Sequence, residues 1–252
     1  MIIQNLHRQP VALDRNAHKN LKLKIPHADW GVASKLNSLF VAAVEFGDAC
    51  KEYPVVFVRA GNDEQGKPLV APVAVFGLAQ EENLFLQPDG SWRASYVPAV
   101  LRMYPFAIAR VDANSFAVCV DSAWSGVSTT EGQALFGPDG QPSEMTLNVQ
   151  KQLEQTEAEV QRTRAVGERL LALDLLRDMR FDAQMPDGKT ISVDGFLTVD
   201  EDKLKALPDA TIVELQRSGL LGVIHAHQIS LGNMRRLAEW RLQRMQAAAP
   251  QA

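Results

Sequence analysis

The chain has 252 residues, 46% of them hydrophobic and 22% charged, and a formal net charge of −4. A chain of this length can bury a sizeable core without a metal or a disulfide, as one large domain or two small ones. The mildly acidic balance lacks the basic footprint of nucleic-acid-binding proteins, so we expect no nucleic-acid partner.

Cysteine usage and hydropathy indicate a soluble protein of a reducing compartment. Cys50 and Cys119 lie far apart in apolar contexts, and the sequence has no CxxC and no ladder of paired cysteines. The first residues form no apolar stretch of signal-peptide length, and no window approaches 18 uninterrupted apolar residues. We therefore expect a cytoplasmic protein with no membrane span.

Short strands dominate the first half of the chain. Alternation with period two predicts half-buried strands, and short β-branched apolar runs predict buried ones. One of these runs contains Pro72, which predicts a strand that starts late or lies at a sheet edge. A short helix is predicted at residues 96–104. The predicted strands are residues 11–13, 21–25, 54–58, 69–78, 83–86, 106–111 and 116–120, the last two joined by a turn at 112–115.

Helical periodicity begins after Gly140. Ser143 can cap a helix that runs to about Arg180. Such a helix would be about 55 Å long, which is long for a globular protein, so we expect a break near Gly167. The strand patch that returns afterwards comprises residues 181–185, 190–193 and 196–199, with a turn at 186–188.

The remaining residues predict further helices. Asp200 is predicted to cap a short helix, and a second one opens at Pro208 and ends before Gly219. Residues 220–246 predict one helix, or two helices with a break at 230–232.

These elements predict an α+β fold. The N-terminal half is strand-rich with short helices, and the C-terminal half is helical with a small strand patch. The parts 1–140 and 141–252 are predicted to form one integrated domain, because strands return after the long helix.

The sequence contains no motif of a familiar enzyme class. A Walker loop, GxGxxG, HExxH, GxSxG and zinc-ligand spacing are all missing, which argues against P-loop, standard Rossmann and zinc-peptidase chemistry. His225 and His227 form the one closely spaced histidine pair, but on a helix their side chains lie about 200° apart. We therefore predict structural roles for both histidines, no metal and no cofactor.

Glu45 is the most unusual carboxylate of the sequence. It follows the apolar run 40–44 and precedes Phe46, so its side chain could be partly buried. A buried carboxylate needs a partner or a raised pKa, and functional sites use both. The alternative is an acidic residue in the first turn of a helix, where the helix dipole favours negative charge.

Aromatic and arginine residues are densest between residues 92 and 106. Two aromatic rings could flank a pocket, and an arginine could pair with an anionic group of a ligand. Such a cluster is also typical of protein interfaces, and the plainer alternative is a short helix whose aromatic side faces the core. The candidate ligand-binding residues are Trp92, Arg93, Tyr96, Arg102 and Tyr104.

Two other groups of polar residues have a structural alternative. Asp121 follows a predicted strand, where polar residues often line sites, although it could equally shape the turn. A group of arginines near the C-terminus, spaced along a helix, favours a solvated helix face over a phosphate site. Its members are Arg235, Arg236, Arg241 and Arg244.

An ordered set of short motifs resembles bacterial SapC-family proteins and covers nearly the whole chain. Each motif is weak alone, whereas their order is fairly specific. They are residues 52–57 (EYPVVF), 82–85 (ENLF), 96–99 (YVPA) with Arg102 and 104–106 (YPF), 194–196 (DGF), 199–201 (VDE), 203–204 (KL), 207–208 (LP), 226–227 (AH) and 230–233 (SLGN).

The resemblance implies a genomic context for the protein and does not imply a reaction. The family takes its name from a surface-layer locus, and its members are often encoded beside TonB-dependent receptors, tryptophan-halogenase-like flavoproteins and cupin-like oxygenases. It carries no established catalytic residues. An unrelated inner-membrane permease shares the name, and the missing membrane spans argue against that identity.

Three hypotheses follow for function. The first is a non-catalytic binding or accessory protein that holds a peptide, a glycan or a partner enzyme at the aromatic and arginine cluster, and the missing catalytic motifs favour it. The second is a small-molecule or protein-modifying enzyme, which requires Glu45, Arg102, Tyr104 and Asp121 to converge on one pocket. The third is a structural subunit that associates with a copy of itself or a partner through the helix at 143–180.

Overall fold

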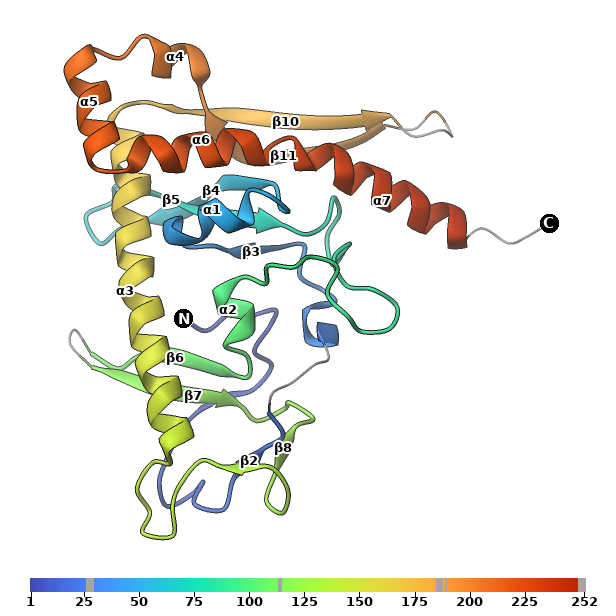
Figure 1. Cartoon of the computed structure of the whole chain (residues 1–252), viewed down its shortest axis with the longest axis vertical. Helices are drawn as coiled ribbons and strands as arrows, with labels where there is room; N and C mark the ends of the chain where they lie inside the picture. Colours follow the sequence, from blue (N-terminus) through green and yellow to red (C-terminus); the bar gives the residue numbers. More distant parts are fainter. Residues whose placement is uncertain (26–29, 113–114, 185–187, 189, 249–252) are drawn as a thin grey trace. The chain divides into compact units, whose positions relative to one another are not determined.

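The computed structural model describes residues 1–25, 30–112, 115–184, 188 and 190–248 (Figure 1). The chain divides into two compact units. The first comprises residues 1–34, 86–92 and 99–158, and the second comprises residues 35–85, 93–98 and 159–252. Strand-rich segments in the N-terminal half and a long helix followed by shorter helices in the C-terminal half confirm the α+β class. The prediction of one integrated domain stays a prediction.

The first unit contains two small antiparallel sheets. One has the order β1-β7-β6 and the other β8-β2-β9. The predicted hairpin is confirmed, with Ile108 opposite Val118, while residues 113–114 of its turn lie outside the described residues. The strands are β1 (Pro10–Ala12), β2 (Lys22–Leu23), β6 (Phe106–Arg110), β7 (Phe116–Asp121), β8 (Val127–Ser128) and β9 (Gln133–Ala134), and the short helices are η1 (Trp30–Ala33) and α2 (Ala99–Arg102).

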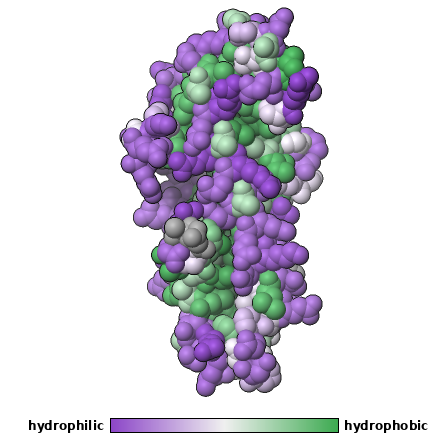
Figure 2. Space-filling view, turned by 90° about the vertical axis from the view of Figure 1, so that its left-hand side faces the viewer, coloured by the Kyte–Doolittle hydropathy of each residue, from purple (hydrophilic) through white to green (hydrophobic). Residues whose placement is uncertain are grey.

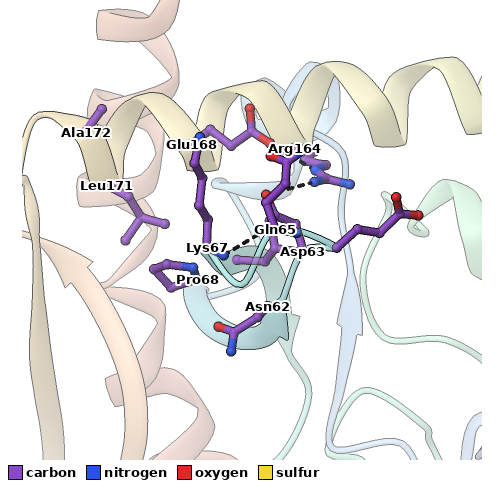
Figure 3. A pocket seen from close by; sticks show the side chains of 11 residues that line it. Asn62, Asp63, Gln65, Lys67, Pro68, Arg164, Glu168, Leu171 and Ala172 are labelled. Carbon is purple, nitrogen blue, oxygen red and sulfur yellow. Dashed lines mark hydrogen bonds and ion pairs between the residues drawn. The ribbon is translucent and has the colours of Figure 1, made fainter.

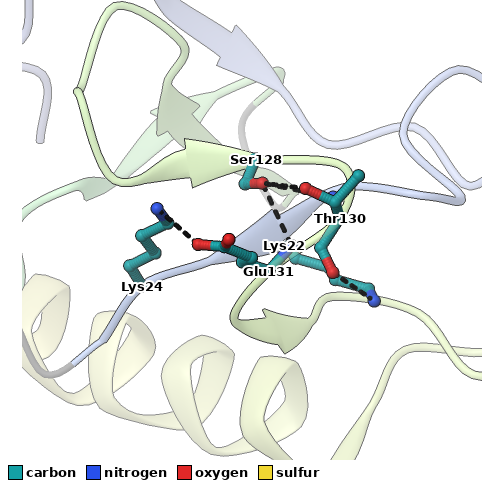
Figure 4. A network of polar contacts seen from close by, with 5 residues as sticks. All are labelled: Lys22, Lys24, Ser128, Thr130 and Glu131. Atoms are coloured by element: carbon teal, nitrogen blue, oxygen red, sulfur yellow. Dashed lines mark hydrogen bonds and ion pairs between the residues drawn. The ribbon is translucent and has the colours of Figure 1, made fainter.

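Exposed polar contacts hold the loop that follows β8 onto β2 (Figure 4). Lys22 Nζ donates to the Thr130 carbonyl at 3.1 Å, and Lys24 Nζ lies 2.7 Å from Glu131 Oε2. Ser128 Oγ accepts from the backbone N–H groups of Thr130 and Glu131, at 3.1 Å each. An exposed ion pair contributes about 0–1 kcal/mol, so this network shapes the loop more than it stabilises the fold.

The second unit is built on a five-stranded sheet with the order β10-β11-β4-β5-β3. Leu197 of β11 pairs with Phe57 of β4, so strands from the two halves of the sequence share hydrogen bonds. The predicted strand patch is confirmed and is longer than expected, although residue 185 of its first strand and residues 186 and 187 of its turn lie outside the described part of the chain. The strands are β3 (Ser38–Phe40), β4 (Val55–Asn62), β5 (Pro68–Val75), β10 (Leu176–Gln184) and β11 (Thr190–Val199).

Pro72 lies inside the sheet, so the prediction that its strand starts late or lies at an edge was wrong. It belongs to β5, which lies between β4 and β3. The Pro72 carbonyl accepts from Val41 N at 3.3 Å, so the backbone of Pro72 faces the β3 side. Because β3 has already ended at Phe40, the missing N–H of the proline costs no bond between strands. Residues 83–86, also predicted as a strand, form only a single bridge, from Leu86.

The long helix α3 (Glu144–Ala172) begins as predicted, with Thr146 N donating to Ser143 Oγ at 3.3 Å. It does not break near Gly167, where a side chain would lie only 2.8 Å from the Val70 carbonyl oxygen. Its predicted end at Arg180 was also wrong. Asp174 adopts φ 51°, and Leu175 N donates to the Leu170 carbonyl at 3.0 Å, which is the closing bond of a Schellman motif.

Short helices complete the second unit. Asp200 caps α4 as predicted, accepting from the N–H groups of Asp202 at 3.0 Å and Lys203 at 3.2 Å. Gly219, at φ 79°, ends α5, and the predicted break at 230–232 separates α6 from α7. The helices are η2 (Ala43–Glu45), α1 (Phe46–Ala49), α4 (Glu201–Lys205), α5 (Asp209–Arg217), α6 (Leu220–Ser230) and α7 (Asn233–Ala248).

His227 fixes α6 to the sheet from a fully buried position. Val199 N donates to its Nε2 at 3.1 Å, and its Nδ1 lies 2.7 Å from the Val55 carbonyl. Because Nε2 accepts, Nδ1 carries the proton and the ring is neutral. Burial lowers the pKa of His227 to about 4. His225 is exposed on another side of α6, as the helical spacing predicts.

Charged side chains cover the outer strand of the five-stranded sheet. Arg177, Asp178, Arg180 and Asp182 of β10 are all exposed. Asp178 pairs with Arg59 at 2.8 Å, and Arg180 pairs with Asp182 at 2.8 Å. Figure 2 shows one face of the molecule, on which hydrophilic residues predominate and apolar residues gather in small patches. Among the described helices, none has the length and hydropathy that a membrane crossing requires.

Candidate functional site

A cavity of about 310 Å³ in the first unit lies beside part of the predicted aromatic and arginine cluster. Arg102, at the end of α2, and Tyr104, just before β6, both line it. Most of the other lining side chains are apolar, so the exposed Arg102 guanidinium and the Gln152 amide are its principal polar groups. The complete lining is Ile25, Trp30, Arg102, Met103, Tyr104, Phe106, Val149 and Gln152.

Trp92 does not line this cavity but packs against Trp30, which does. Its ring packs edge-on against Trp30, with ring centroids 6.2 Å apart, and its side chain is buried. Trp30 in turn donates its backbone N–H to the Gly90 carbonyl at 3.2 Å. The sequence singled out Trp92, whereas it is Trp30 that faces the cavity.

Tyr104 and Asp121 form a buried pair. The Tyr104 hydroxyl donates to Asp121 Oδ2 at 2.9 Å, and the backbone N–H groups of Arg8 and Gln9 donate to the same carboxylate at 3.0 Å and 2.8 Å. Burial alone would raise the pKa of Asp121, but these hydrogen bonds outweigh it and hold the pKa below its usual value. Burial, together with the bond to Asp121, raises the pKa of Tyr104. Asp121 therefore anchors the N-terminal segment to β7.

Glu45 and Tyr96, both singled out in the sequence, meet in the second unit. The Tyr96 hydroxyl donates to Glu45 Oε1 at 2.6 Å, and Ala42 N donates to Oε2 at 2.8 Å. Glu45 is buried and caps η2, the first-turn role weighed as an alternative. Glu52 fixes the same segment by accepting from Ser95 N at 2.9 Å and Tyr96 N at 2.8 Å. Both carboxylates therefore hold backbone in place.

Arg93 stacks on α7 in the second unit. Its guanidinium carbon lies 4.4 Å from the Trp240 ring centroid, and that of Arg236 lies 5.1 Å from the same centroid. This is a cation–π arrangement in which two arginines share one indole. Arg93 therefore contributes to the packing of α7 on residues 93–98.

The prediction of a solvated arginine face is confirmed for Arg235, whose side chain is 88% exposed. It was wrong for Arg236 and Arg241, which are half-buried: Arg236 donates to the Glu52 carbonyl, and Arg241 lies 3.4 Å from Glu82 Oε2. Arg244 is exposed but donates to the Asn83 carbonyl at 2.9 Å. These arginines bind this chain's own polar groups.

A larger and more polar depression of about 890 Å³ lies in the second unit, between the β4–β5 turn and the last turns of α3 (Figure 3). Arg164 there binds Glu168 at 2.9 Å and lies 3.8 Å from Asp63. Asp63 Oδ1 also accepts from Lys67 N at 2.8 Å. Asp63, Arg164 and Glu168 are thus paired with one another, and Glu64 and Lys67 are the other charged residues of the lining. Most of the lining is polar or charged, unlike the mostly apolar walls of small-ligand sites.

The sequence-predicted site residues thus do not form one cluster. Trp92 packs against Trp30. Arg102 and Tyr104 share a cavity, Tyr104 and Asp121 share a hydrogen bond, Glu45 and Tyr96 share another, and Arg93 stacks on Trp240. Of the cavity lining, the sequence missed Ile25, Trp30, Met103, Val149 and Gln152. The four-residue spacing from Asn148 to Gln152 was the available signal, but it is equally typical of any solvated helix.

Within the described ranges, no three histidine, cysteine, aspartate or glutamate side chains are grouped in a way that could hold a metal ion. The fold and the cavity define an α+β protein with a small apolar pocket that carries one guanidinium group. By sequence the chain belongs to the SapC family, whose family model matches residues 13–237, and the resemblance is thereby confirmed. No curated protein and no solved structure matches the chain.

Proposed function

We propose that the protein is a non-catalytic binding or accessory protein and that the cavity at Arg102 is its ligand site. The observation that carries the proposal is the make-up of the cavity, since apolar walls with a few placed polar groups are typical of small-ligand sites. Its volume of about 310 Å³ is at the lower end for such sites. The family resemblance suggests surface-layer or TonB-receptor-type loci as its setting, and the cysteine usage favours the cytoplasm.

The hydrogen bonding of the carboxylates supports binding over catalysis. A general base must lie within hydrogen-bond reach of the proton that it abstracts, and a general acid must present its proton to the substrate. Glu45 uses one oxygen for Tyr96 and the other for Ala42, within the second unit. Asp121 is fully buried and its oxygens accept three backbone N–H groups and one hydroxyl. An enzyme with Glu45, Arg102, Tyr104 and Asp121 as its working groups remains the competing hypothesis.

Association through the long helix is supported less well. A self-pairing helix needs apolar side chains at regular intervals along its outer face. Leu147, at 53% exposure, is the one large apolar side chain of α3 that is clearly exposed, and most of its other exposed residues are polar.

The binding proposal predicts that filling the cavity abolishes ligand uptake. Val149→Phe places extra volume in the cavity that Trp30 also lines, and the fluorescence of Trp30 reports occupancy. We expect N-acetyl-leucine or N-acetyl-phenylalanine to shift the tryptophan emission of the wild-type protein saturably, and Val149→Phe to weaken this binding at least about tenfold. Val213→Phe, at a half-exposed position of α5, is the matched control. Equal binding by Val149→Phe and wild type would show that the cavity is not the site.

A further inference from the structure

The cavity at Arg102 borders a second depression on the first unit. This neighbour, of about 420 Å³, shares Val149 and Gln152 with the cavity. Its other lining side chains are Gln133, Glu144, Met145 and Asn148. A ligand longer than one small group can therefore lie across both.

The shared wall is the first part of α3. Glu144, Asn148 and Gln152 are spaced by four residues, so they form one polar stripe along the helix. Eight residues separate the ends of this stripe, which is about 12 Å along the helix axis. An extended peptide covers that distance with roughly four residues at about 3.3 Å each.

The cavity end of this surface suits the last residue of a peptide. Ile25, Trp30, Met103 and Phe106 can enclose one apolar side chain. The Arg102 guanidinium beside them offers N–H donors in a planar fork, the geometry that matches a carboxylate. An apolar side chain and a carboxylate on the same α-carbon are what a free peptide C-terminus presents.

The polar stripe suits the residues that precede the C-terminus. Each of the Asn148, Gln152 and Gln133 amides both donates and accepts, as the alternating N–H and C=O groups of a peptide backbone require. Glu144 lies at the far end, so the charges run from positive at Arg102 to negative at Glu144. A peptide bound with its carboxylate on Arg102 has the complementary polarity.

We propose that the ligand is an extended peptide of about four residues with a free C-terminal carboxylate and an apolar last side chain. This inference rests on the proposed function and adds the class and direction of the ligand. A glycan fits less well, because an oligosaccharide carries hydroxyl groups along its whole length and would leave them unpaired against the apolar end.

The test compares Gly-Ala-Ala-Leu with a free N-terminal amine as the free acid, the same peptide as its C-terminal amide, and N-acetyl-leucine, by tryptophan fluorescence and calorimetry. We expect the amide to bind at least about tenfold more weakly than the acid. Arg102→Gln should remove this preference and Arg102→Lys should reduce it, because lysine keeps the charge but loses the fork. Asn148→Ala should weaken the tetrapeptide about threefold or more and leave N-acetyl-leucine unchanged, while Gln155→Ala, exposed on α3 outside both depressions, should change neither.

Different results distinguish a failure of the peptide assignment from a failure of the proposed binding function. The peptide assignment would be overturned if the acid and the amide bound with equal affinity, or if chitotriose bound more tightly than the peptide at the same residues. In either case, binding of N-acetyl-leucine would still support the cavity as the site. Failure of every probe, with each variant shown to be folded by circular dichroism, would remove both.

Discussion

At the scale of single residues, His227 has the most constrained chemistry in the chain. Its Nε2 must stay unprotonated, because the Val199 N–H points at it. Protonation would place two donors against each other in a fully buried position. The folded state therefore holds the neutral ring, whereas the unfolded chain takes up a proton on this ring below about pH 6.5.

This difference predicts a pH dependence of stability. The pKa of His227 is about 4 in the folded protein, against 6.5 for an unperturbed histidine. Between these values the unfolded chain binds a proton that the folded chain excludes, so the stabilisation is complete above pH 6.5 and is lost as the pH falls toward 4. The slope reaches up to about 1.4 kcal/mol per pH unit. Urea unfolding at pH 7, 5.5 and 4.5 measures it.

Two histidine variants isolate the contribution of His227 to the pH dependence of stability. His227→Gln should flatten the slope between pH 6.5 and 4, whereas His225→Gln, on the exposed side of the same helix, should keep it. Carboxylates titrate in the lower part of this range in all three proteins, so the difference between the variants is the quantity to compare. Parallel curves for the two variants would show that another group dominates.

Residue chemistry could be predicted only in part. Glu45 and Tyr96 were both selected from the sequence and do share a hydrogen bond, but nothing local in the sequence indicates which side chain will meet the Glu45 carboxylate. Trp30 was missed because it follows a polar stretch and has no periodic neighbours. A cavity wall is a property of several segments at once, and a single sequence does not record which segments meet.

At the scale of elements, two helical glycines predict opposite effects of the same substitution. Glycine inside a helix costs about 0.5–1 kcal/mol relative to alanine. Gly222 of α6 has open space where a side chain would be, so Gly222→Ala should stabilise by about that amount. A Cβ at Gly167 of α3 would lie 2.8 Å from the Val70 carbonyl oxygen, so Gly167→Ala should destabilise by about 1–3 kcal/mol. Thermal and urea unfolding measure both, and stabilisation by both variants would contradict the close packing of α3 on β5.

The elements were predicted well where local chemistry decides them. Ser143 and Asp200 cap helices through their own side chains, and Gly219 supplies a positive φ, so these ends could be predicted. The end of α3 could not, because Asp174 adopts a positive φ without being glycine. The position of Pro72 inside the sheet could not be predicted either. The sheet accommodates this proline because β3 ends at Phe40, and β3 is distant from Pro72 in the sequence.

At the scale of the whole molecule, the five-stranded sheet predicts that the two halves of the sequence do not fold apart. Val55 of β4 is fully buried and binds side chains of α6 through both its N–H and its carbonyl. The fragment 1–140 would expose it together with Phe57, which pairs with β11. We expect neither 1–140 nor 141–252 to unfold cooperatively alone, and their co-expression to restore a soluble complex.

Gel filtration and thermal unfolding of each fragment test this expectation. A fragment 1–140 that is monomeric and unfolds in one sharp transition would contradict it. The full chain is the control for the transition.

The charged edge strand β10 affects the tendency of this protein to aggregate at high concentration. A strand at the border of a sheet offers unsatisfied N–H and C=O groups to any passing chain, and such contacts seed aggregation. Along β10, Arg177, Asp178, Arg180 and Asp182 alternate in sign, so a neighbouring copy aligned with Asp178 opposite Asp182 would bring like charges together. The charges of this edge strand therefore disfavour pairing of two copies in that register.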